Sequence, residues 1–331
     1  MELSTNLTDR ERRTIDLAKA LAVLSVIAAH VVSRQNTFWL VDIITAVWTL
    51  FGEVGVIVFF VIGGFLYSRK VNDSRTFWKK KVFRIVIPWV FCSFLTYSLS
   101  AALSHSFSLV ACLKWKLGSG TWYYYATLYI FFLLVFKWFY KNNIILYIII
   151  IMQTVALTLN SIGISTTIPL GFFTDYLNPI YWIGYFSLGV LLRKKRFDTI
   201  LRENAVVSIL GAILFVASFL ILYHREIYTY FNVVTSVFCI SSAILILNIT
   251  YWFAQVKASY YIAKIGKFSF CIFLLHMQIV QSVVSQIPNG IIKMLLSPFV
   301  GLAVMLILIS IGLGICKNLP FGDKIKLVVG L

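Results

Sequence analysis

Charged residues are scarce in this chain of 331 residues, because Asp, Glu, Lys and Arg together make up only 12% of it. That is about half the share found in an ordinary soluble domain. Acidic residues are the scarcer kind, with 12 Asp and Glu against 29 Lys and Arg, which gives a formal net charge of +17. The basic residues lie between apolar blocks, so this charge does not indicate a nucleic-acid-binding protein.

Several sequence motifs are also absent. The chain has no G-x-S-x-G, no Walker A and no G-x-G-x-x-G after a strand, and this argues against a serine hydrolase and an ATP-driven pump. No metal-ligand cluster is evident. The five cysteines show neither paired nor metal-like spacing, so we interpret them as packing residues: Cys92, Cys112, Cys239, Cys271 and Cys316.

Apolar residues are abundant instead, at 60% of the chain. They form blocks of roughly twenty residues, the length that an α-helix needs to cross ~30 Å of hydrocarbon. A transmembrane barrel would need alternating segments of about ten residues. We therefore predict an all-α polytopic membrane protein with ten spans, at about residues 17–33, 43–67, 82–103, 122–139, 143–160, 178–192, 204–223, 229–252, 268–286 and 291–316.

The basic residues predict the orientation of these spans. With both termini in the cytoplasm, 24 of the 29 Lys and Arg residues fall on the cytoplasmic side, as the positive-inside rule expects. We expect the first span to remain uncleaved. The connections are short, so we expect one membrane-embedded domain over residues 1–331 without an appended soluble domain.

Among the ionisable residues inside predicted spans, three stand out: His30, Glu53 and His276. Such groups are costly in a bilayer, which makes each a functional candidate. Lys19 lies eleven residues before His30, so both residues share one helix face, about 16 Å apart. The structural alternatives are a hydrogen-bonded core histidine at either position and an ion pair of Glu53 with His30 or Arg34.

Two further segments carry candidate binding residues. The segment "SRKVNDSRTFWKKKVFRIVIP" contains Lys81 and Arg84, and its charge is typical either of positive-inside topology or of a site for the phosphates of a nucleotide-like cofactor. The segment "GTWYYYATLYI" contains Trp122 and Tyr123. Its aromatic residues are typical either of a membrane interface or of a surface that stacks on sugar rings.

The motifs also carry a resemblance to a known family. Lys19 and His30 follow "ID", and the later segments are "GVIVFFVIGGFLYSRK", "KKKVFRIVIPW", "TWYYYATLYI", "YWIGYFSLGVLLRKK" and "IGKFSFCIFLLH". In this order, over about residues 13–316, they resemble the acyltransferase 3 family of integral membrane proteins, which O-acylate bacterial surface polysaccharides. The chain departs from the family pattern at Gly63, where a serine is usual, and at Phe273, where a tyrosine is usual.

The resemblance implies an O-acetyltransferase of the bacterial cytoplasmic membrane. It implies acetyl-CoA as the donor substrate, no permanently bound cofactor, and a cell-surface or lipid-linked glycan as the acceptor. A glycan exporter of similar architecture and a ligand-sensing membrane protein are the alternatives. The implied roles are catalysis by His30 with Glu53 and His276, binding of coenzyme A phosphates by Lys19, Lys81 and Arg84, and acceptor binding by Trp122 and Tyr123.

Overall fold

A computed structural model describes residues 7–32, 38–67, 74–166, 174–194, 205–287, 291–320 and 322–330. These residues form helices and connections, and no strand occurs among them. The α-helices are α1 (Asp9–Val31), α2 (Trp39–Tyr67), α3 (Ser74–Lys81), α4 (Ile87–Leu103), α5 (Leu109–Leu117), α6 (Tyr124–Phe139), α7 (Asn143–Ser161), α8 (Ile183–Lys194), α10 (Ala205–Arg225), α11 (Val233–Phe253), α12 (Ser259–Lys267), α13 (Ser269–Val284), α14 (Ile291–Lys317) and α15 (Gly322–Val328). A π-helical turn, η1 (Val82–Val86), joins α3 to α4, and two 3-10 turns, η2 (Asp175–Leu177) and η3 (Pro179–Tyr181), precede α8.

The predicted fold class is confirmed, because the chain is an all-α polytopic membrane protein and each expected span coincides with a helix. Within the described residues, seven helices are long and apolar enough to cross a membrane, and a bent pair brings the number to as many as eight. Two of the expected spans, α6 with 16 residues and α8 with 12, are shorter than the roughly twenty residues of a full span. The predicted number of ten spans and the orientation stay predictions.

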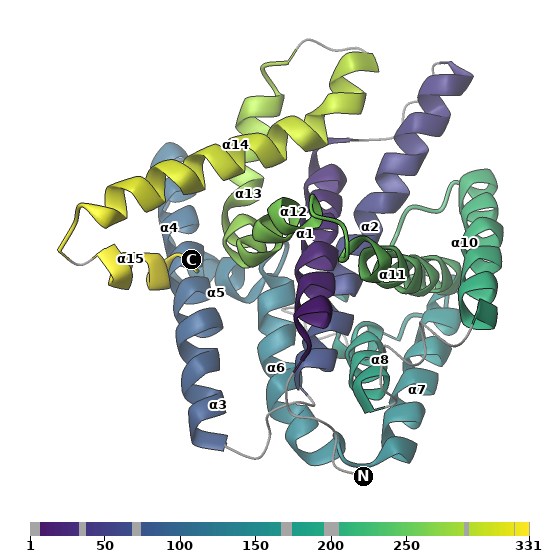
Figure 1. Cartoon of the computed structure of the whole chain (residues 1–331). Helices are drawn as coiled ribbons and strands as arrows, with labels where there is room; N and C mark the ends of the chain where they lie inside the picture. Colours follow the sequence, from purple (N-terminus) through teal and green to yellow (C-terminus); the bar gives the residue numbers. More distant parts are fainter. Residues whose placement is uncertain are drawn as a thin grey trace.

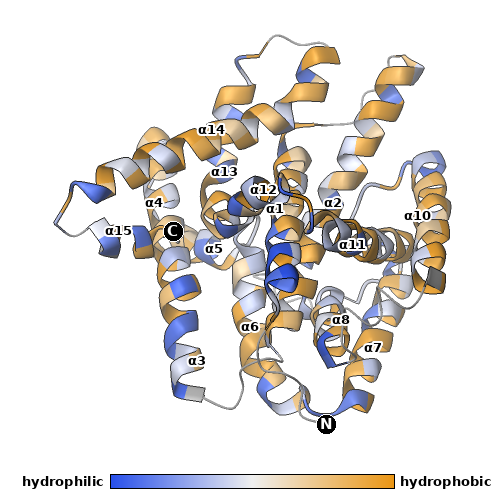
Figure 2. Cartoon of the chain, in the orientation of Figure 1, coloured by the Kyte–Doolittle hydropathy of each residue, from blue (hydrophilic) through white to orange (hydrophobic). Residues whose placement is uncertain are grey.

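Burial separates a central pair of helices from the periphery. In the most apolar window of α2, 78% of the residues are buried inside the protein, and in that of α1 61% are buried. The corresponding shares are 17% for α10 and 22% for α14. Figure 1 shows α10 and α14 on the outside of the bundle, and Figure 2 shows that their residues are largely hydrophobic. Such surfaces suit contact with lipid rather than water.

Small residues let α2 lie very close to its neighbours. An added Cβ at Gly52 would collide with Ala29 of α1, and an added Cβ at Gly64 would collide with the Phe186 carbonyl of α8. Backbones can pack this closely only where side chains are absent. The two glycines therefore fix α2 between α1 and α8, and so help to determine where Glu53 is placed.

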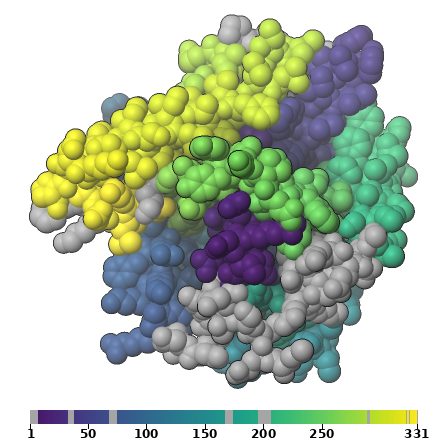
Figure 3. Space-filling model, in the orientation of Figure 1, coloured from purple at the N-terminus to yellow at the C-terminus, as the bar shows by residue number. Residues whose placement is uncertain are grey.

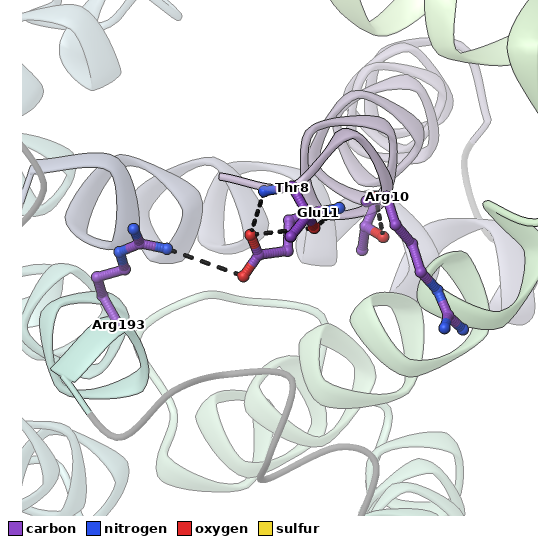
Figure 4. A network of polar contacts seen from close by, with 5 residues as sticks. Thr8, Arg10, Glu11 and Arg193 are labelled. Carbon is purple, nitrogen blue, oxygen red and sulfur yellow. Dashed lines mark hydrogen bonds and ion pairs between the residues drawn. The ribbon is translucent and has the colours of Figure 1, made fainter. Parts of the chain in front are cut away.

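The first turn of α1 is anchored by a polar network (Figure 4). The Thr8 hydroxyl accepts a hydrogen bond from the Glu11 backbone, and the Glu11 carboxylate accepts one from the Thr8 backbone at 2.7 Å, forming a capping box. The same carboxylate lies 4.0 Å from a guanidinium nitrogen of Arg193 on α8. Arg10 stacks over Tyr251 of α11, 3.6 Å from the ring centre. These contacts hold the helix that carries Lys19 and His30.

A sharp bend of 71° separates α12 from α13, and the sequence did not predict it. The expected span covered only residues 268–286, whereas α12 is a separate short helix against α1. An added Cβ at Gly266 would collide with the backbone carbonyl of Asp16, so the two helices touch there. Figure 3 shows α1 reaching the surface of this face only as a small patch beside this region. The bend brings Lys267 close to the helix that carries Lys19.

The predicted orientation has a direct test. A reporter fused after the last residue should read as cytoplasmic, and a cysteine at Ser106, in a Cys112→Ser background, should react from outside with an impermeant thiol reagent. Ser106 is exposed between α4 and α5, on the predicted outer side. Labelling from the cytoplasmic side only, with an outward C-terminus, would reverse the orientation.

Candidate active site

Two cavities follow one another along the same four helices, α1, α2, α6 and α13. The first, which we call the inner cavity, has a volume of about 190 Å³ and is lined by Lys19, Arg84 and Lys267. The second, the outer cavity, has a volume of about 440 Å³ and is lined by His30 and Glu53. One cavity thus gathers cations, and the other gathers the groups capable of proton transfer.

The names follow the predicted orientation, since all three cations of the inner cavity belong to the predicted cytoplasmic side. A third cavity, of about 690 Å³ between α1, α2, α10 and α11, is lined by apolar residues apart from Ser242. None of its lining residues is a base or a cation. We therefore consider the inner and outer cavities together as the candidate site.

A distortion of the backbone sets the position of Arg84. Pro88 has no N–H to bond the carbonyl of residue 84, and its ring collides with that carbonyl in a regular helix. The chain responds with the π-helical turn η1, in which the Ile87 N–H bonds to the Val82 carbonyl. Single π-helical turns often occur at functional sites. Here the turn contains the arginine that lines the inner cavity.

The other two predicted binding cations lie close by. Lys81 donates a hydrogen bond to the hydroxyl of Tyr129, 3.0 Å away, and Tyr129 lines the inner cavity. Lys19 lines the cavity directly and forms an ion pair with Asp16 at 3.5 Å. Lys19 and Arg84 therefore line the inner cavity together with Lys267, and Lys81 is bonded to Tyr129, which also lines it.

Two histidines far apart in the sequence lie side by side at the outer cavity. The ring centres of His30 on α1 and His276 on α13 are 5.1 Å apart, with the rings tilted by 39°. His30 lines the cavity and is partly exposed to it, whereas His276 is fully buried behind it. His30 is thus the histidine that a bound molecule could reach.

The tautomer of His276 follows from its hydrogen bond. Its Nδ1 lies 2.8 Å from the Phe273 carbonyl, which can only accept, so Nδ1 carries the proton. Its Nε2 is then an unprotonated acceptor, and among the described residues it has no hydrogen-bond partner. A buried polar atom without a partner is unusual and costly. This atom is available to accept a hydrogen bond or a proton next to His30.

Glu53 lies in a group of aromatic residues that line the outer cavity. The Tyr230 hydroxyl hydrogen-bonds its carboxylate, while the other carboxylate oxygen, Oε2, is buried without a partner in the described part of the chain. The rings of Tyr124 and Tyr176 lie 5.0 Å apart beside it. The sequence also allowed an ion pair of Glu53 with Arg34, but Arg34 lies outside the residues that the structure describes.

The two aromatic residues predicted to bind substrate have different positions. Trp122 lines the outer cavity, and its ring centre lies 6.2 Å from that of His276. Tyr123 is fully buried and does not line the cavity. Its hydroxyl points elsewhere, since it donates to the Leu274 carbonyl at 2.9 Å and lies 3.0 Å from the Thr96 hydroxyl. The next residue along the chain, Tyr124, lines the cavity in its place.

Comparison with protein families identifies this arrangement. The acyltransferase domain model of the acyltransferase 3 family matches residues 12–315, which is nearly the whole chain. The chain belongs to this family. The match spans both cavities and every candidate residue. Comparison with curated proteins and with solved structures finds no match.

As a member of this family, the protein is a multi-pass membrane acyltransferase. Acyl transfer to a hydroxyl needs a base to take the hydroxyl proton and a site for the donor. The outer cavity supplies candidate bases, and the inner cavity supplies cations. Within the described residues, no three His, Cys, Asp or Glu side chains are grouped so as to hold a metal ion.

Gly63, one of the departures from the family pattern, lies in the wall of the inner cavity of this acyltransferase. An added Cβ there would collide with the ring of Tyr129. The absent side chain therefore leaves the space that Tyr129 occupies while it bonds Lys81. The departure at Gly63 therefore affects local packing, because the Tyr129 ring occupies the space that a serine side chain at this position would need.

Sequence reasoning missed several residues of the site. Tyr176 lies in the 3-10 turn η2 and Tyr230 lies just before α11, and no sequence motif marked either residue as part of the site. Lys267 was seen only as one of many cytoplasmic charges. The aromatic run "TWYYYATLYI" did signal the region of Tyr124, but helical rotation decides which of its tyrosines faces the cavity.

Proposed function

We propose that this acyltransferase is an O-acetyltransferase of the bacterial cytoplasmic membrane, which transfers acetyl groups from cytoplasmic acetyl-CoA to a hydroxyl of a cell-surface or lipid-linked glycan. One observation carries the proposal. A cavity lined by cations and a cavity lined by His30 and Glu53 follow one another along the same four helices. Phosphates are bound by such cations, and hydroxyl attack on a thioester requires such a base.

The donor would bind with its phosphates at the inner cavity. Lys19, Arg84 and Lys267 line this cavity, and Lys81 is held at its edge by Tyr129. The distance along α1 from Lys19 to His30 is about 16 Å. The pantetheine arm of acetyl-CoA is an extended chain, so it suits a path in which the phosphates stay at the cations and the thioester approaches the histidine.

The acceptor would bind in the outer cavity. Its lining combines a carboxylate, Glu53, with the rings of Trp122, Tyr124, Tyr176 and Tyr230. Carboxylates accept hydrogen bonds from sugar hydroxyls, and aromatic faces pack against the C–H faces of sugar rings. This lining therefore suits a sugar acceptor better than an apolar acceptor.

The reaction then needs one base. His30 takes the proton of the acceptor hydroxyl as the oxygen bonds to the thioester carbonyl carbon. The tetrahedral intermediate breaks its C–S bond, and His30 returns the proton to the sulfur, so that acetyl ester and coenzyme A thiol leave. His276, in contact with His30, positions its ring. Imidazole suits this role because its ordinary pKa lies near neutral pH.

Purified protein in liposomes tests the proposal directly. Acetyl-CoA carrying a labelled acetyl group is added with candidate glycans, and label is expected in an alkali-labile ester on the glycan. Movement of glycan across the bilayer without acetyl-CoA would instead support a glycan exporter. Absence of any labelled ester with all acceptors tried, from protein that is folded by thermal stability, would contradict an acetyltransferase.

The donor site makes a further prediction. Lys81→Gln combined with Arg84→Gln should raise the KM for acetyl-CoA by about tenfold, because two charge-assisted phosphate contacts are lost. High salt should reduce the difference from wild type, since exposed charge contacts are screened. Initial rates at varied acetyl-CoA concentration measure the effect.

A matched control lies in the same helix. Lys79 and Lys80 of α3 are exposed and do not line the inner cavity. Changing both to Gln removes the same net charge, and the KM for acetyl-CoA should stay within about twofold of wild type. If both double variants raise the KM equally, the charges of residues 79–84 act only through the long-range electrostatic field or the membrane topology, and not through direct contact with the phosphates.

A further inference from the structure

The boundary between the two cavities is formed by aromatic side chains. Phe273 of α13 lines both cavities, while Phe59 and Tyr125 are the residues of α2 and α6 that line the inner cavity and lie nearest in sequence to the outer-cavity residues of those helices. Val56, three residues before Phe59 on α2, and Tyr124, one residue before Tyr125 on α6, line the outer cavity. We call Phe59, Tyr125 and Phe273 the aromatic partition.

Within the aromatic partition, the Tyr125 ring packs against the rings of both Phe59 and Phe273. The ring centres of Tyr125 and Phe273 are 5.1 Å apart with an edge-on angle of 70°, and those of Phe59 and Tyr125 are 5.9 Å apart. All three side chains are buried, and Phe273 is only 3% exposed. Such packing leaves little room between the cavities for anything wider than a short chain.

The partition is connected to both ends of the site. Tyr125 stacks with Tyr129, which accepts the hydrogen bond of Lys81 at the inner cavity. Phe273 lies one turn from His276, whose Nδ1 donates to its carbonyl, and the two rings are 6.0 Å apart. A thioester that travels from the cations to the histidines must therefore pass the Phe273 ring.

We propose that the aromatic partition, and Phe273 above all, selects the length of the acyl group. This inference rests on the proposed function, because it assumes an acyl-CoA donor in the inner cavity. With the thioester at His30, the pantetheine arm runs between the rings and the acyl group lies beside Phe273, whose ring also lines the outer cavity. The two-carbon acetyl group fits there, whereas each added methylene needs space that this ring occupies. A single methylene changes discrimination by about 10–200-fold in a tight pocket.

Rates with acyl-CoA donors of increasing length test the inference. Wild type should transfer acetyl from acetyl-CoA and transfer butyryl and hexanoyl groups at least about tenfold more slowly. Phe273→Ala replaces the ring by a methyl group, so the ratio of butyryl to acetyl transfer should rise by at least about tenfold. Phe273→Leu should raise it less, because more of the side chain remains.

Phe136→Ala is the matched control. Phe136 is a fully buried phenylalanine of α6 that packs on Phe132 and Phe186 and lines neither cavity. Its loss should lower stability by a comparable amount while leaving the ratio of butyryl to acetyl transfer unchanged. A ratio that rises equally in Phe136→Ala would overturn the inference, since general loosening of the core would then explain the change.

The possible failures can be told apart. If wild type transfers acetyl and longer groups equally, or if the ratio in Phe273→Ala equals that of wild type, the partition is not a selector, although the protein remains an acyltransferase. If wild type transfers no acyl group from any acyl-CoA, the proposed donor is wrong and the inference falls with it. If Phe273→Ala does not accumulate in the membrane, the ratio in Phe273→Leu decides.

Discussion

Glycan acetylation by the His30→Gln variant should be at least about 100-fold slower than by wild type, with the protein inserted in membranes at its normal level. Glutamine keeps the approximate size and can hydrogen-bond, but it cannot take a proton near neutral pH. A general base contributes about 10²–10⁴-fold to a rate. His30 lines the outer cavity beside His276, so its loss removes the base that an acceptor can reach. Labelled acetyl ester on glycan, normalised to protein amount, measures the effect.

The chain supplies its own control for this experiment. It has four histidines, and His224, at the end of α10, is exposed and lines neither cavity. His224→Gln should leave the rate unchanged. His276→Gln should cost less than His30→Gln, because His276 is buried behind His30 and acts through it. Near-normal acetylation by His30→Gln would remove the assignment and leave His30 as a structural histidine.

Glu53→Gln should reduce kcat/KM for the acceptor by about 10–100-fold, while the KM for acetyl-CoA stays near its wild-type value. Removing one partner of a buried hydrogen bond costs about 1–3 kcal/mol, which corresponds to a factor of about 5–150. The carboxylate lies in the outer cavity with one oxygen unpartnered in the described structure, so an acceptor hydroxyl can donate to it. Initial rates at varied glycan and saturating acetyl-CoA measure the change.

Two variants sharpen the test of Glu53. Tyr230→Phe removes only the hydroxyl that bonds the carboxylate, and we expect it to cost less than Glu53→Gln. Glu226→Gln makes the same chemical change in the connection after α10, outside both cavities, and should have no effect. If Glu53→Gln lowered thermal stability and left kcat/KM unaltered, the carboxylate would serve packing alone.

The sequence supported the general location of the site but not its details. Lys19 and His30 could be placed on one helix face because helical geometry depends only on spacing. The sequence shows Pro88 four residues after Arg84, but the π-helical turn that this proline causes was not predicted from it. No sequence motif marked Tyr176 or Tyr230 as part of the site.

Length and polarity alone determined the all-α membrane fold and the segments that became helices, because the cost of polar groups in hydrocarbon leaves few other solutions. They also singled out His30, Glu53 and His276, since titratable groups in such segments are rare. Only the tertiary structure decided that His276 lies beside His30, that Tyr124 rather than Tyr123 lines the outer cavity, and that Phe273 lies between the two cavities and lines both. These outcomes depend on how each helix is rotated and how closely it packs, and that is set by contacts between segments far apart in the chain.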